Sequence, residues 1–163
     1  MSSTKGMKLD KTEVARRQLG TALALFIEDL DPISVHTLAR AGGEIAEHLT
    51  RKAMSKPFID HALATFPDET LKKIRGLQNQ FSNAFKHAST KTRKEGGDLK
   101  LLRRFNDLQN DHMLFVGWYD YMLAVNAMPI EAHVFQVWYF ALYPEKLNPK
   151  VDASQYDAVV APE

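Results

Sequence analysis

Apolar residues recur at every third or fourth position along most of this chain, and this spacing is what most restricts its fold. An α-helix has about 3.6 residues per turn, so side chains at this spacing share one face and can be buried together. The first such stretch follows Asp10, which with Glu13 has the spacing of a capping box. It predicts a helix that extends to about Asp29. Its apolar face comprises Ala15, Leu19, Ala22, Leu23, Phe26 and Leu30.

Caps and prolines divide the following sequence into further helices. Asp31 followed by Pro32 is typical of a cap and a first helical position, because proline lacks the N–H that a helix start leaves unpaired. Pro57 and Pro67 begin new segments, and residues 89–98 have the composition of a loop. The predicted helices are residues 32–51, 57–66, 69–88, a long one from Asp98 onward, and 130–143.

The helix after Asp98 is expected to be unusually long. About thirty residues at about 1.5 Å each would extend roughly 45 Å, which is more than a compact domain of 163 residues needs. We therefore expect part of this helix to contact a partner. Its apolar seam has a heptad-like spacing and comprises Phe105, Leu108, His112, Phe115, Tyr119 and Met122.

Gly42 and Gly43 interrupt the helix predicted for residues 32–51. Adjacent glycines inside a helix indicate either close packing against a neighbour or a kink. A phosphate-binding loop is disfavoured, because no strand precedes the pair and no helix begins after it.

Together these elements predict an all-α fold, an up-and-down bundle of about five to six helices. A chain of 163 residues suits one domain, to which we assign residues 8–146, with flexible tails at 1–7 and 147–163. The helix predicted for 130–143 is apolar nearly all round, so it should be central or covered by a second subunit. We predict a homodimer.

Composition excludes several classes of function. The chain has no cysteine, which excludes disulfide scaffolds, thiolate zinc sites, iron–sulfur clusters and a cysteine nucleophile. A formal net charge of +1 does not demand nucleic acid or an anionic membrane as a partner. The longest apolar stretch, 113–128, is too short to span a bilayer, and residues 1–8 lack a secretion signal. We expect a cytoplasmic protein without membrane contact and without a cofactor.

One flank of the fourth predicted helix carries a small polar group. Asn83 and His87 are four residues apart, so their side chains can meet, and Lys86 adds a cation beside them. Histidine titrates near neutral pH and asparagine can hold one of its tautomers, which makes a functional site feasible. The competing interpretation is that His87 lies in the last turn and only interacts with the exposed carbonyls there.

Two segments carry a resemblance to known proteins. The segment Asn83-Ala84-Phe85-Lys86-His87-Ala88 and the segment His36-Thr37-Leu38-Ala39 resemble those of a group of small, uncharacterised bacterial helical proteins. The likeness covers residues 11–142, although only these segments are distinctive. More distantly, the helical arrangement resembles the HEPN superfamily, whose catalytic members are metal-independent RNases with an arginine–histidine motif at a homodimer interface.

The HEPN motif is only partly present. Asn83 and His87 fit it, but Ser82 stands where the arginine should be. Arginine would stabilise the charge on the transferring phosphate, and Lys86 could replace it only as a point charge. The resemblance therefore implies the fold and the dimer more than it implies catalysis.

Three functions follow as hypotheses. The leading one is a non-catalytic helical-bundle homodimer that binds a protein partner or nucleic acid. The first alternative is metal-independent RNA cleavage, with His87 as general acid or base and with Asn83 and Lys86 steadying the phosphate. The second alternative is a metal-binding bundle.

Basic residues gather next to the polar flank. They suggest an edge that binds a ligand or nucleic acid, although an exposed, solvated loop would have the same composition. The binding candidates, with the histidine of the second resembling segment, are His36, Lys91, Arg93, Lys94, Arg103 and Arg104.

His112 lies within the apolar seam and is interpreted as a core or interface residue whose polar atoms find partners. A metal site would need companions, and the helical pattern Glu-x-x-His that marks carboxylate-bridged bundles is missing from the sequence. We therefore assign no metal ligand. Aromatic residues crowd positions 118–143, where they predict core, dimer interface or a ligand pocket between helices.

Overall fold

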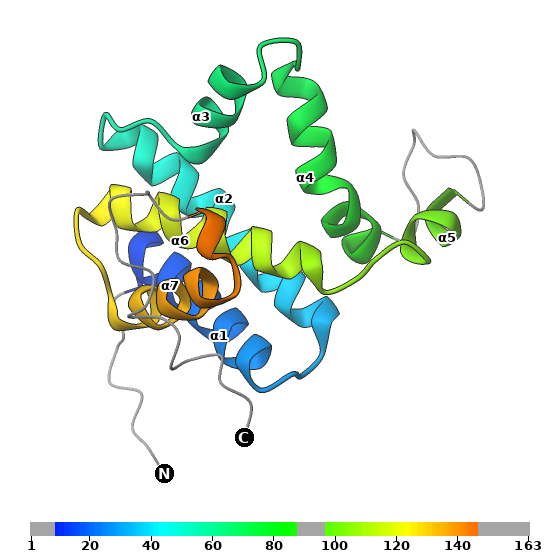
Figure 1. The fold of residues 1–163 in the computed structure, drawn as a ribbon, viewed down its shortest axis with the longest axis horizontal. Coiled ribbons are helices and arrows are strands. Elements are labelled where there is room, and N and C mark those ends of the chain that lie inside the picture. The colour runs from blue at the N-terminus through cyan, green and yellow to red at the C-terminus, as the bar shows by residue number, and fades with distance from the viewer. Residues whose placement is uncertain (1–8, 88–96, 147–163) are drawn as a thin grey trace.

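The computed structural model describes residues 9–87 and 97–146, and in this part of the chain every regular element is a helix (Figure 1). The predicted all-α class is confirmed. The tails predicted at 1–7 and 147–163 lie outside the described residues. The elements are α1 (Lys11–Ile27), α2 (Pro32–Lys52), α3 (Phe58–Thr65), α4 (Leu71–Lys86), α5 (Gly97–Leu102), α6 (Leu108–Val125), α7 (Ile130–Leu142) and a short 3-10 helix (Pro144–Lys146).

Side-chain caps place the starts of the first, second and fourth helices. The Asp10 carboxylate accepts a hydrogen bond from the Glu13 N–H at 2.8 Å, as the capping-box spacing predicts. The Asp31 carboxylate accepts from the Ser34 N–H at 3.0 Å. Helix α4 begins two residues later than predicted, because the Thr70 hydroxyl caps it by accepting from the N–H of Lys73.

The glycine pair allows three helices to pack closely. A Cβ atom added at Gly42 would lie 2.8 Å from Cγ of Leu19, and one added at Gly43 would lie 3.4 Å from the Cα atom of Gly117. Helix α2 runs unbroken through both positions. The close-packing interpretation is therefore confirmed.

Helix α2 is the centre of the molecule and packs most extensively against α6 and α1. The core between them is apolar and tightly filled, with Leu19, Ala39 and Leu114 fully buried and Trp118 only 1% exposed. Helix α7 covers one side of this core. Its buried residues are Ala132, Phe135 and Tyr139.

The expectation that α7 is central is wrong. Only one of its faces is buried, while Ile130, Val134 and Leu142 are 66%, 44% and 42% exposed. The remaining interpretation from the sequence, a second subunit on the outer face, stays a prediction. None of the helices in the described part of the chain is long and apolar enough to cross a bilayer.

The prediction of one long helix after Asp98 is also wrong. The chain forms two helices, α5 and α6, which residues 103–107 separate. The Asn106 side chain accepts a hydrogen bond from the Leu108 N–H at 3.1 Å, so a side chain replaces a helical carbonyl there. Phe105 turns inward, with its ring centroid 5.3 Å from that of Phe81. Tertiary packing thus overrides the helical spacing of the apolar residues. The predicted length of this helix therefore no longer supports a contact with a partner.

Helices α3 and α4 rise from the layer of α2 and α6 and meet at a turn, so that together they form an arm (Figure 1). We use "the arm" below for residues 57–86. Polar contacts join it to the rest of the protein. The Asp120 carboxylate of α6 accepts from the Phe58 N–H at 2.7 Å, and Arg51 forms a salt bridge with Asp60 at 2.8 Å.

The second half of the arm is joined to α2 in a similar way. Arg40 Nε donates to Asn79 Oδ1 at 2.6 Å, and Arg75 Nη1 donates to Glu47 Oε2 at 2.7 Å. Both α2 residues are buried, Arg40 to 5% exposure and Glu47 to 7%. These contacts lie along one side of α4, and a cavity lies between the arm and α6.

Candidate ligand-binding cavity

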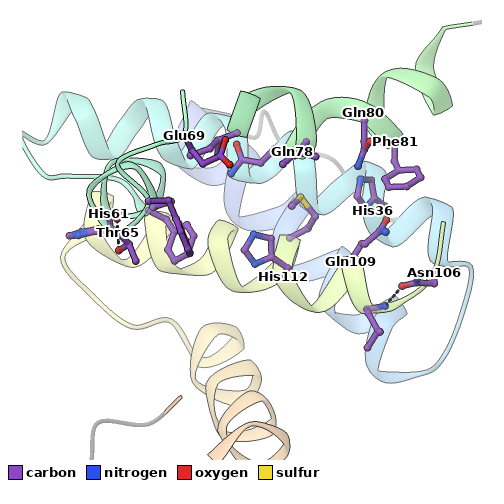
Figure 2. A pocket seen from close by; sticks show the side chains of 17 residues that line it. His36, His61, Thr65, Glu69, Gln78, Gln80, Phe81, Asn106, Gln109 and His112 are labelled. Atoms are coloured by element: carbon purple, nitrogen blue, oxygen red, sulfur yellow. Dashed lines mark hydrogen bonds between the residues drawn. The ribbon is translucent and has the colours of Figure 1, made fainter. Parts of the chain in front are cut away.

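A cavity of about 830 Å³ lies between the arm and the layer formed by α2 and α6. Its wall is mainly apolar, with Ile74 and Leu77 from α4, Phe58 from α3 and Met113 from α6. Figure 2 shows polar side chains at two ends of this wall, with His36, Gln80 and Gln109 at one end and His61, Thr65 and Glu69 at the other. The arrangement suits a molecule with an apolar body and a polar group.

His36 is the most informative residue of the wall. Its side chain is 1% exposed, and its Nδ1 atom lies 3.1 Å from Oδ1 of Asn110. The Asn110 amide donates to the Pro32 carbonyl at 3.1 Å, and a carbonyl can only accept, so the orientation of this amide is set. Its oxygen therefore faces His36, and Nδ1 must carry the proton. Nε2 is left as an acceptor, and it has no hydrogen-bond partner.

The surroundings of His36 favour its neutral form. The rings of Phe81, Phe85 and Phe105 meet the imidazole edge to face, with centroids 6.1, 5.6 and 5.5 Å away. Burial among these rings lowers the pKa of His36, and the positive charge of nearby Arg40 lowers it further, although the bond to Asn110 opposes the change. An acceptor Nε2 is the state expected at neutral pH.

Three other buried atoms on the wall also have no hydrogen-bond partner. They are Oε1 of Gln109, near His36, and Oε1 of Gln78 and Oε2 of Glu69, which lie toward the other end. The second oxygen of Glu69 accepts from Lys73 Nζ at 2.6 Å. A buried polar atom without a partner is uncommon in folded proteins and indicates an occupant or a neighbour still to be supplied.

His112 differs from its interpretation as a core residue. Its side chain is exposed into the cavity, where it lies against Phe58 with ring centroids 5.8 Å apart. Protein atoms nevertheless surround much of the ring, and this desolvation lowers the pKa of His112. The heptad-like seam does not mark the buried face of α6, because Leu108 is 70% exposed and the buried face carries Leu114, Trp118 and Tyr121. At His112 the arm stands away from α6 and leaves a space.

The structure does not bring the side chains of Asn83 and His87 together. His87 is the C-cap of α4, and only its backbone N–H bonds to the Asn83 carbonyl, at 3.1 Å. The side chains of Asn83, Lys86 and His87 are exposed, and none of them lines the cavity. RNA cleavage by His87 stays a prediction of the sequence, and no described contact of this side chain supports it.

The other predicted binding residues lie in different parts of the protein. His36 lies in the cavity wall. Arg103 and Arg104 are exposed in the turn after α5, whereas Lys91, Arg93 and Lys94 lie outside the described residues. Binding of nucleic acid by these basic residues stays a prediction.

Sequence reasoning missed most of the cavity. The sequence did not indicate Gln78, Gln109 or His61 as site residues, because single polar residues on a helix flank look the same whether they face water or a cavity.

In residues 9–87 and 97–146 no three His, Asp or Glu side chains gather closely enough to hold a metal ion. No family model, curated protein or solved structure matches the chain. The resemblance to bacterial helical proteins and to HEPN domains therefore stays a prediction.

Proposed function

We propose that this protein binds a small, mainly apolar molecule in the cavity between the arm and helices α2 and α6. The proposal rests on one observation. The wall of a cavity of about 830 Å³ contains a buried histidine, and one ring nitrogen of this histidine has no hydrogen-bond partner. Sites for small molecules are typically apolar spaces of roughly 300–1,000 Å³ with a few polar groups that fix orientation.

The construction of the arm supports this proposal. Ion pairs and hydrogen bonds hold it to α2 and α6, while much of its apolar surface remains uncovered by the core: Leu77 is 59% exposed and Phe66 58%. Both side chains line the cavity. An apolar occupant would remove this surface from water and so be bound by the hydrophobic effect.

The test is to fill the cavity and measure binding of an apolar fluorescent probe, N-phenyl-1-naphthylamine. Ala62 lines the cavity from α3, whereas Ala64 of the same helix is exposed and does not line it. We expect saturable binding to the wild type and to Ala64→Trp. In Ala62→Trp the indole would occupy the site, so affinity should fall by about tenfold or more.

Two results would contradict the proposal. One is the absence of saturable binding to the wild type. The other is equal affinity in Ala62→Trp and Ala64→Trp, which would place the probe elsewhere on the surface. Circular dichroism checks that both variants keep the helical fold.

A further inference from the structure

The hydrogen bonds of His36 determine which polar group could bind to its free ring nitrogen. The chain of bonds from the Pro32 carbonyl through the Asn110 amide to His36 Nδ1 fixes the neutral tautomer. Nε2 can therefore accept a hydrogen bond and cannot donate one. The group that satisfies it must be a donor.

The neighbouring unpartnered atom points to the same chemistry. Gln109 lies at the same end of the cavity, and its Oε1 atom also lacks a partner (Figure 2). Both atoms are buried, so an occupant reaches them only if a neighbouring side chain of the wall shifts. A group with a lone pair but no hydrogen, such as an ether or a carboxylate, would meet two acceptors there and leave both unsatisfied.

The two common donors are an ammonium group and a hydroxyl group, and their charge distinguishes them. Arg40 is buried on the same helix, one turn from His36, and its positive charge acts on the imidazole. An ammonium group at Nε2 would be repelled by this guanidinium in a poorly solvated place. A hydroxyl group donates one hydrogen bond without a charge, and it can also accept one from an amide N–H if the Gln109 side chain rotates.

We infer that the occupant of the cavity is an apolar alcohol whose hydroxyl donates a hydrogen bond to Nε2 of His36. This inference rests on the proposed function and adds the chemical class of the ligand. The apolar body lies against Ile74, Leu77 and Met113, and the hydroxyl lies at the end where α2, α4 and α6 meet.

Two isomers provide the test. 2-Naphthylmethanol and 2-methoxynaphthalene have the same formula and nearly the same shape, but only the alcohol can donate a hydrogen bond. Each is titrated against wild-type protein loaded with N-phenyl-1-naphthylamine, and displacement is measured. We expect the alcohol to bind about threefold to tenfold more tightly than the ether, the ratio of one net hydrogen bond. 2-Naphthylmethylamine, a cation at neutral pH, should bind more weakly than the alcohol.

Variants locate the preference at His36. His36→Phe keeps an aromatic ring among the three phenylalanines but removes Nε2, so the two isomers should bind it equally. His61→Phe makes the same exchange at the other end of the cavity and should keep the preference. A measurement without substitution covers the case in which His36→Phe does not fold. In histidine-labelled wild type, the ¹⁵N resonance of unprotonated Nε2 should shift with the alcohol and not with the ether.

The outcomes separate this inference from the proposed function. If the probe does not bind, or neither isomer displaces it, the proposed function itself is wrong. If both isomers displace it with equal affinity, the cavity binds apolar molecules but the alcohol assignment is overturned. Tighter binding of the cation or the ether overturns the assignment as well.

Discussion

At the scale of single residues, a hydrogen atom in place of a side chain sets how closely the core helices approach. Gly42 faces α1, where an added Cβ would lie 2.8 Å from Leu19 and 3.1 Å from the Ala15 carbonyl oxygen. Gly76 lies on an exposed part of α4, and nothing lies within 4 Å of a Cβ added there. The same substitution should therefore have opposite effects at the two positions.

We expect Gly42→Ala to lower the free energy of unfolding by about 1–3 kcal/mol, because α1 would have to move away from α2. Gly76→Ala should raise it by about 0.5–1 kcal/mol, because alanine restricts the unfolded chain and favours helix. Urea denaturation of both variants checks this. Equal changes of the same sign would show that the close approach of α1 and α2 is not needed for stability.

Asp120 is a buried acid whose ionisation opposes folding. Its side chain is 1% exposed, and burial raises its pKa from 3.8 to about 7, although the Phe58 N–H that it accepts opposes the rise. Between these two values the folded protein holds a proton that the unfolded chain has released. The contribution of Asp120 to stability is therefore fullest below pH 4 and falls as the pH rises toward 7.

Asparagine at this position should remove that dependence, because its amide oxygen can still accept from the Phe58 N–H. We expect Asp120→Asn to be more stable than the wild type by about 1–3 kcal/mol at pH 8, with the difference shrinking toward pH 4. Parallel curves of unfolding free energy against pH for the two proteins would contradict this, since the wild-type carboxyl would then titrate as it does in the unfolded chain.

At the scale of elements, one buried carboxylate of α2 links both helices of the arm to the core through two arginines. Glu47 of α2 accepts hydrogen bonds from Arg75 of α4 and from Arg51, which also pairs with Asp60 of α3. Burial alone would raise the pKa of Glu47, but the bonds and charges of Arg75 and Arg51 outweigh it, and the pKa is lowered. The carboxylate is therefore charged and paired at neutral pH.

Neutralising this group should loosen the arm before it unfolds the core. We expect Glu47→Gln to lower the free energy of unfolding by about 1–3 kcal/mol, since two guanidinium groups lose their shared partner. Amide hydrogen exchange should quicken in α3 and α4 and change little in α1 and α6. Uniform acceleration over all helices would show that the arm and the core open together.

The boundaries of the helices show which local signals are sufficient. Asp10 and Asp31 fix helix starts by accepting hydrogen bonds from residues two or three positions away, and Pro32 does so through its fixed backbone angle. The sequence therefore predicts those starts well. The break at 103–107 was not foreseen. It depends on Phe105 packing against Phe81 and Phe85, and no local pattern reports contacts of that kind.

At the scale of the whole molecule, the outer face of α7 is the surface that a second copy would cover. Ile130 and Val134 are four residues apart and exposed, on a helix whose other face is in the core. Homodimer formation stays a prediction from the sequence. Exposed large apolar side chains on one helix are enriched at interfaces between subunits.

We expect light scattering to return the mass of a dimer at micromolar concentration. Val134→Glu should shift the protein toward monomer, because it buries a charge in the interface. Ala64→Glu adds the same charge on exposed α3 and should leave the dimer intact. A monomeric wild type, or equal behaviour of the two variants, would remove α7 as an interface.

The sequence by itself determined the helical class and several helix starts, and it limited Gly42 and Gly43 to close packing or a kink. Each of these follows from groups that are near one another along the chain, or from the size of a single residue. It did not determine the cavity, nor that the polar flank at Asn83 and His87 would face water.

Only the tertiary structure decided the state of His36. Its proton is placed by Asn110, which is 74 residues away, and its unpartnered nitrogen is buried. A hydrogen bond between distant segments depends on how whole helices pack, and the spacing of apolar residues carries no information about it. The candidate site therefore becomes visible only when α2, α4 and α6 are brought together around one imidazole ring.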